Sequence, residues 1–167
     1  MKLTSTAFED GNPIPAKYTG DGADISPPLA WTEGPAGTRS FALLCDDPDT
    51  PAGDWVHWLI YGIPSTARGP AEHVAPTEKL SNGARQGLNG FGRIGYGGPC
   101  PPPGKPHRYF FRLYALDNDP TLRPHPGKAD LLHAMQGHIL AEAQLIGTYQ
   151  HSQPVHAAAG GDQQTGH

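Results

Sequence analysis

The sequence predicts a mainly β domain, and three observations support that prediction. Of its 167 residues, 22 are glycine and 19 are proline, and they are spread between short apolar runs. Such a composition is typical of short strands joined by tight turns. Three apolar runs alternate on a period of two, and only one short segment near the C-terminus shows helical spacing. The length suits one domain that buries a real core.

Charge and apolar patterning exclude several classes of partner. Charged residues make up 17% of the chain, the formal net charge is -4, and no block of five like charges occurs. Because phosphate-backbone binding needs a basic stripe, we expect no nucleic-acid partner. The N-terminus lacks the apolar core of a signal peptide, and no apolar run reaches 18 residues, so no transmembrane segment and a cytoplasmic location are expected. Cys45 and Cys100 are then more consistent with thiols than with a disulfide.

Three central strands are expected at residues 38–46, 55–63 and 107–116. Both faces of the first strand are apolar until its end, which places it inside the sheet. On a period of two, the sets that share a face are Phe41, Leu43, Cys45 and Asp47; Ala42, Leu44 and Asp46; Trp55, His57, Leu59 and Tyr61; and His107, Tyr109, Phe111 and Leu113.

The remaining segments are predicted as edges, loops and one helix. Residues 24–31 carry two prolines, which predicts an extended edge segment, with Trp31 as a core residue. A short amphipathic helix is expected at 128–136, ended by glycine. Residues 139–149 could prolong that helix, but a closing strand is favoured. From residue 150 the composition turns to Gln, His, Ala and Gly, so residues 150–167 are expected to form a disordered tail.

Polar side chains gather where the central strands begin or end. The first strand runs into Asp47 and Asp49, the second carries His57 near its start, and the third begins with His107 and Tyr109. A stiff glycine- and proline-rich loop at 91–104 lies between the second and third strands. We expect these groups to meet at one corner of the sheet. Each also has a plainer interpretation, since Asp49 can serve only as a turn residue and either histidine as a structural one.

The combination of two carboxylates and two imidazoles favours a binding site, because burying them without a partner is costly. Carboxylates that face imidazoles fix the tautomer and favour the protonated ring, which can donate to an anion. Backbone N–H groups of Gly97 and Gly98 are expected to hold further oxygens of that anion. A phosphate, sulfate or carboxylate fits this chemistry, and a phosphomonoester with an amine fits better because the surplus acids could pair the amine.

Five motifs together resemble one known family. They are Asp-Gly-Ala-Asp-Ile-Ser-Pro-Pro-Leu-Ala-Trp (21–31), Asp-Asp-Pro-Asp-Thr-Pro (46–51), Trp-Val-His-Trp (55–58), Gly-Tyr-Gly-Gly-Pro-Cys-Pro-Pro (95–102) and His-Arg-Tyr-Phe-Phe (107–111). In this order they resemble the phosphatidylethanolamine-binding protein family, in its bacterial and archaeal Raf-kinase-inhibitor-like branch. The resemblance covers residues 1–149, which form the expected domain.

The resemblance implies a Greek-key β-sandwich with one or two short helices and a small anion pocket at one end. The pocket residues that it implies are Asp47, Asp49, Trp55, His57, Gly98, Pro99, His107 and Tyr109. The implied ligand is phosphate or a phosphoryl lipid head group of the phosphoethanolamine kind, and the implied partner is a kinase or hydrolase whose activity is modulated. A cis bond at Thr50-Pro51 is also implied. No counterpart of the C-terminal helix of eukaryotic relatives is expected, because residues 150–167 carry no helical apolar stripe.

Three functional hypotheses follow for the corner. A non-catalytic binding protein without a cofactor is favoured, because no activated nucleophile is evident among the motifs. A metal-dependent enzyme is the second hypothesis, since two histidines and a carboxylate can bind iron or zinc, although no metal-type spacing such as His-x-His occurs. A thiol hydrolase is the third, with Cys100 as nucleophile and His107 as base. Exposed strand edges also predict a homodimer.

Overall fold

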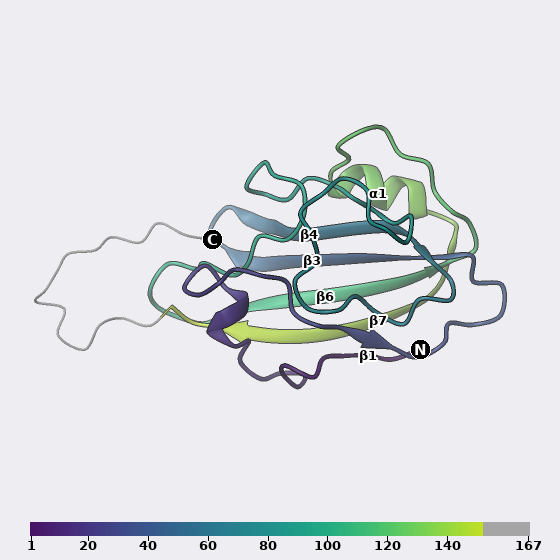
Figure 1. Cartoon of the computed structure of the whole chain (residues 1–167). Helices are drawn as coiled ribbons and strands as arrows, with labels where there is room; N and C mark the ends of the chain where they lie inside the picture. The colour runs from purple at the N-terminus through teal and green to yellow at the C-terminus, as the bar shows by residue number, and fades with distance from the viewer. Residues whose placement is uncertain (152–167) are drawn as a thin grey trace, which may run out of the picture.

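A five-stranded antiparallel sheet forms the centre of the structure, a computed structural model in which residues 1–151 are described. The strands follow the spatial order β5 (Arg85–Gln86), β4 (Gly53–Pro64), β3 (Ser40–Thr50), β6 (His107–Leu116) and β7 (Ile139–Tyr149). A two-stranded sheet of β1 (Leu3–Thr4) and β2 (Ala30–Trp31) lies on one face. The helix α1 (Lys128–Met135) lies on the other face (Figure 1), and a 3-10 turn spans Ala16–Tyr18.

The predicted fold class and central elements are confirmed. All three expected strands are present and adjacent, with β3 between β4 and β6. The helix begins at Lys128 as expected. Residues 139–149 form a strand, because their backbone pairs with β6 from His107 opposite Tyr149 to Leu116 opposite Ile139. Pairing with a buried neighbour therefore decides between the two conformations that this segment allows.

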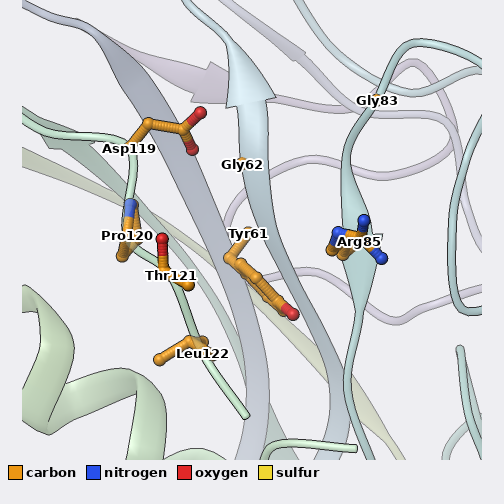
Figure 2. Close-up of a pocket in the computed structure, with 8 residues that line it drawn as sticks. All are labelled: Tyr61, Gly62, Gly83, Arg85, Asp119, Pro120, Thr121 and Leu122. Carbon is orange, nitrogen blue, oxygen red and sulfur yellow. The ribbon is translucent and has the colours of Figure 1, made fainter. Parts of the chain in front are cut away.

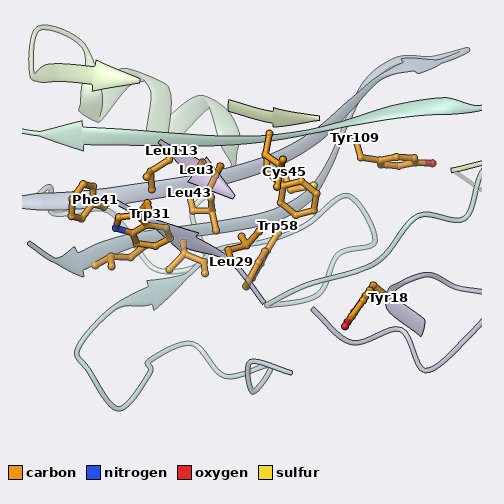
Figure 3. Packing of buried hydrophobic residues seen from close by; sticks show 14 of the residues in the cluster. Leu3, Tyr18, Leu29, Trp31, Phe41, Leu43, Cys45, Trp58, Tyr109 and Leu113 are labelled. Carbon is orange, nitrogen blue, oxygen red and sulfur yellow. The ribbon is translucent and has the colours of Figure 1, made fainter. Parts of the chain in front are cut away.

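Two apolar clusters occupy the two faces of the large sheet. The first contains Phe41, Leu43, Cys45, Tyr109, Phe111 and Leu113 of the sheet, packed against Leu3, Leu29 and Trp31 of the small sheet and its flanking loop (Figure 3). The second contains Ala42, Leu44, Leu59, Tyr61, Tyr114 and Leu116, packed against Leu131 and Met135 of α1. The face assignments predicted for β3 and β6, and the core position of Trp31, are thus confirmed.

The predicted grouping of His57 with Leu59 and Tyr61 on one face is wrong, because β4 contains a β-bulge. Trp58 lies opposite Cys45, while Val56 lies opposite Asp46, so one extra residue of β4 is inserted between neighbouring positions of β3. Trp58 belongs to the first cluster, and Leu59 belongs to the second. The bulge brings the buried His57 beside Tyr109, with ring centroids 5.2 Å apart, on the face of the first cluster.

Two expectations about the backbone are revised. Residues 1–151 contain no cis peptide bond, so the implied cis bond at Thr50-Pro51 is wrong. The tail was expected to begin at residue 150, but Gln150 and His151 still contact the domain. The Gln150 amide donates to the Gly104 carbonyl, and His151 Nδ1 lies 2.9 Å from Asp21 Oδ2. The rest of the predicted tail, 152–167, lies outside the described residues.

Candidate functional site

Four strand ends meet at one corner of the large sheet. Asp47 near the end of β3 lies opposite Trp55 of β4, and His107 at the start of β6 lies opposite Tyr149 at the end of β7. The antiparallel order therefore brings together polar residues that are far apart in the sequence. This is the corner that the sequence motifs predicted.

A buried carboxylate and an imidazole form the centre of this corner. Asp47 Oδ2 lies 2.7 Å from His107 Nδ1, and the exposed fractions of the two residues are 0% and 8%. The other Asp47 oxygen accepts the backbone N–H of Asp49 at 2.7 Å. Burial raises the pKa of Asp47, although the hydrogen bond from His107 acts in the opposite direction. The carboxylate thus fixes a proton on Nδ1 of His107 and leaves Nε2 as the ring nitrogen that is available to a ligand.

His57 is held by the backbone of the glycine- and proline-rich loop. Its Nδ1 lies 2.5 Å from the carbonyl oxygen of Gly97, and the Gly97 N–H donates to the His57 carbonyl at 2.9 Å. Because a carbonyl can only accept, the ring carries a proton on Nδ1. The Nδ1 atoms of the two histidines therefore have different partners, a backbone carbonyl for His57 and the expected carboxylate for His107.

Tyr109 carries a buried hydroxyl at the same corner. The residue is 0% exposed, and its hydroxyl has no hydrogen-bond partner within residues 1–151. In Figure 3 the hydroxyl is at the end of the Tyr109 side chain that points away from Cys45 and Trp58. Burial raises the pKa of Tyr109, and the charge of Asp47 raises it further. Leaving such a group unsatisfied costs about 1–3 kcal/mol, so the hydroxyl marks a position for an acceptor.

The glycine- and proline-rich loop contributes shape and not free donors. The Gly97 N–H donates to the backbone carbonyl of His57, and the Gly98 N–H donates to Asp24 Oδ1 at 2.7 Å. The expectation that these N–H groups hold an anion is therefore wrong. Gly98 is required for space, because a Cβ there would lie 2.4 Å from the carbonyl oxygen of Tyr18. The adjacent Pro99 is buried and accepts the N–H of Gly20 at 2.8 Å.

Asp49 lies at the rim and is bound by Arg108. The Asp49 carboxylate accepts the backbone N–H and Nε of Arg108, both at 2.9 Å, and its Nη2 at 2.8 Å. These bonds hold the pKa of Asp49 below its usual range. The carboxylate is therefore already paired and is not the partner expected for a ligand amine. Asp46 lies on the opposite face, as predicted, where it binds Arg112 and Lys128.

An aromatic wall completes the corner and includes a residue that sequence reasoning missed. Phe91 packs edge-on against Trp55 at 5.5 Å between centroids and against His57 at 5.8 Å. Nothing in the spacing around Phe91 could have identified it. Asp21 and Asp24 were missed as well, although both lie in the first motif. Asp24 anchors Gly98, and Asp21 accepts the Tyr149 hydroxyl at 2.5 Å.

The two enzyme hypotheses have no further support in the described part of the chain. Within residues 1–151, no three His, Cys, Asp or Glu side chains are close enough to hold a metal ion. Cys45 and Cys100 form no disulfide with each other, and burial raises the pKa of Cys45 well above its usual value. Cys100 is half-buried beside Gly20, where an added Cβ on Gly20 would lie 3.1 Å from Cys100 Sγ.

No helix within residues 1–151 is long and apolar enough to cross a membrane.

A family model and full-length relatives match this chain. The family model described as phosphatidylethanolamine-binding protein matches residues 4–150. A UPF0098 protein of Methanothermobacter thermautotrophicus is 52% identical over 149 residues, which cover 89% of this chain and 98% of the relative. A UPF0098 protein of Aquifex aeolicus is 47% identical over 151 residues, which cover 89% of this chain and 88% of the relative.

Two solved structures resemble the fold closely. The putative phosphatidylethanolamine-binding protein homolog of Chlamydia trachomatis has a TM-score of 0.82 and 42% identity, over 90% of this chain and 97% of its own. YbcL of Escherichia coli, described as a new member of the mammalian family, has a TM-score of 0.83 and 33% identity, over 90% and 98% of the two chains. The matched residues include all five motifs and the whole corner, and the chain belongs to the phosphatidylethanolamine-binding protein family.

Proposed function

We propose that this protein is a non-catalytic binding protein that takes a small anion at the Asp47–His107 corner. The ligand is phosphate or a phosphoryl lipid head group of the phosphoethanolamine kind. The observation that supports the proposal most directly is the buried hydroxyl of Tyr109, which lacks a partner within residues 1–151, on the same strand face as the Asp47-bound His107. A phosphate oxygen supplies the acceptor that the hydroxyl requires.

The chemistry of the corner suits an anion more than a cation. Asp47 is hydrogen-bonded to His107, and Asp49 is paired with the guanidinium of Arg108, so each carboxylate already has a donor of its own. A protonated His107 can donate through Nε2, and Tyr109 can donate through its hydroxyl. Hydrogen bonds to an ionised acceptor are about twice as strong as neutral ones.

Isothermal titration calorimetry with inorganic phosphate, phosphoethanolamine and a short-chain phospholipid tests this proposal. The wild-type protein should bind at least one of the three, and His107→Ala should weaken that binding by about tenfold or more. His138→Ala is the matched control, because His138 forms a comparable 2.7 Å pair with Asp117 on the exposed surface. Absence of binding, or an equal effect of both substitutions, would disprove the proposal.

We further propose that a second copy of the chain binds along β7. Residues near Ile146 and Thr148 of this strand are covered by the chain between Asp10 and Ile14, which forms backbone hydrogen bonds with both. At the other end of the strand, Ile139 and Leu140 are 41% and 40% exposed. Pairing of two such edges would bury these side chains in a homodimer.

A cytoplasmic location and a modulated kinase or hydrolase partner stay predictions of the sequence.

A further inference from the structure

A polar pocket lies at the end of the large sheet opposite to the Asp47–His107 corner. Its volume is about 350 Å³, and its lining comes from β4, β5 and the chain that follows β6: Tyr61, Gly62, Gly83, Arg85, Asp119, Pro120, Thr121 and Leu122 (Figure 2). Both β4 and β6 begin at the corner described above and run antiparallel to β3, so their far ends meet here. Tyr61 belongs to the apolar cluster beneath α1, which places the pocket on the helix side of the sheet.

Two opposite charges face this pocket without a partner of their own. Arg85 is exposed on β5 directly opposite Tyr61 in the strand register, and Asp119 is exposed on the loop after β6. Neither side chain makes a hydrogen bond or an ion pair within residues 1–151. The two groups lie on either side of Tyr61 (Figure 2). An arginine and an aspartate are thus presented together at the wall of one cavity.

The floor of the pocket is built by Tyr61 and Gly62. Tyr61 is only 5% exposed and lines the pocket. Burial raises the pKa of Tyr61, and the charge of Arg85 opposes this shift, as expected for a guanidinium close to the phenol. Gly62 has a φ of 65°, which favours glycine, and a Cβ there would approach Asp119 Oδ1 to 3.4 Å.

We propose that this pocket binds a free α-amino acid, with Arg85 on the carboxylate, Asp119 on the ammonium group and Tyr61 beneath the ligand. The planar guanidinium fork matches a carboxylate, and the aspartate matches an ammonium group. The volume lies at the lower end of the range for small-molecule pockets. Thr121 adds a hydroxyl at the rim. The site is separate from the anion corner, so this inference does not rest on the function proposed above.

The charge balance selects a zwitterion over a simple anion. A phosphate or acetate placed at Arg85 would also meet the unpaired carboxylate of Asp119, which opposes its binding. An amine placed at Asp119 would meet Arg85 in the same way. A ligand that carries both charges at short separation pairs with both side chains. Each side chain that loses water on binding then gains an opposite charge in its place.

Amide chemical shifts in a ¹⁵N-labelled full-length protein test this inference, with L-alanine as the probe. Alanine should cause saturable shifts at Gly62, Gly83 and Arg85, whereas acetate and ethylamine, which each carry one charge, should bind at least about tenfold more weakly. Arg85→Gln and Asp119→Asn should each weaken alanine binding by about tenfold or more. Thermal unfolding of each variant shows whether it remains folded.

Two controls make the result specific. Arg123→Gln removes another exposed arginine, which pairs with Asp130 outside the pocket, and should leave alanine binding unchanged. His107→Ala should also leave it unchanged, because His107 lies at the other end of β6. The inference is overturned if alanine gives no saturable shift at these amides. It is equally overturned if acetate binds as tightly as alanine, or if folded Arg85→Gln and Asp119→Asn proteins retain wild-type affinity.

Discussion

Replacing Tyr109 by phenylalanine tests two effects of the buried hydroxyl separately, its effect on the stability of the fold and its effect on phosphate binding. The ring is fully buried and packs against His57, and phenylalanine keeps those contacts. The hydroxyl has no partner within residues 1–151, so removing it removes an unsatisfied polar group that costs about 1–3 kcal/mol. In phosphate-free buffer, Tyr109→Phe should therefore raise the free energy of unfolding by about 1–3 kcal/mol, which corresponds to roughly 2–4 °C in Tm per kcal/mol.

The same substitution should weaken the anion site. Loss of one hydrogen bond to a charged ligand should lower phosphate affinity by about tenfold or more, so that phosphate stabilises the wild-type protein more than the variant. Urea unfolding at several phosphate concentrations measures both effects.

Tyr96→Phe is the matched control for this experiment, because the Tyr96 hydroxyl donates to the Tyr18 carbonyl at 2.6 Å. This control should lower the free energy of unfolding by about 1 kcal/mol. If Tyr109→Phe destabilises the protein as much as Tyr96→Phe does, the reasoning about the unsatisfied hydroxyl is refuted.

Three further predictions concern the rim, the loop and the strand edge. Because Arg108 lowers the pKa of Asp49 in the folded state, the carboxylate stabilises the fold above its unfolded pKa of about 3.9, and this stability is lost as the pH falls through the lowered folded value. Asp49→Asn should thus lower the free energy of unfolding by up to about 1 kcal/mol at neutral pH, and the variant and the wild-type protein should become equally stable in acid. A difference in stability that grows in acid would contradict this. Gly98→Ala should destabilise the protein by about 1–3 kcal/mol through its clash with the backbone of Tyr18, whereas Gly127→Ala, whose Cβ meets nothing closer than 4.0 Å, should be nearly neutral in chemical denaturation. Leu140→Lys should convert a dimer into a monomer by light scattering, and a wild-type protein that is already monomeric would refute the dimer.

The sequence was sufficient to predict the strands because each carries a strong local signal. The apolar alternation in β3 and β6 places Cys45 and Tyr109 on the same buried face, and the structure confirms it. The composition and the motifs identified the fold and the family. The segment at 139–149 was ambiguous by itself, and its partner β6 determined the outcome.

The details of the corner depend on contacts between distant segments, which no local pattern contains. The bulge at His57 arises from the pairing of β3 with β4, so period-two counting grouped His57 with Leu59 and Tyr61, which lie on the other face. The N–H groups of Gly97 and Gly98 could be assigned only once His57 and Asp24 were located. The sequence likewise gave no sign that Arg108, on the opposite strand face from His107, would reach Asp49.

A crystal structure of the protein grown in phosphate tests the central claim most directly. The account predicts a phosphate at the corner, with oxygens within hydrogen-bond distance of His107 Nε2 and the Tyr109 hydroxyl, while Asp47 remains bound to His107 Nδ1. Phosphate found only elsewhere on the molecule, with the Tyr109 hydroxyl bonded to some other group of the chain, would contradict the assignment of this corner as an anion site.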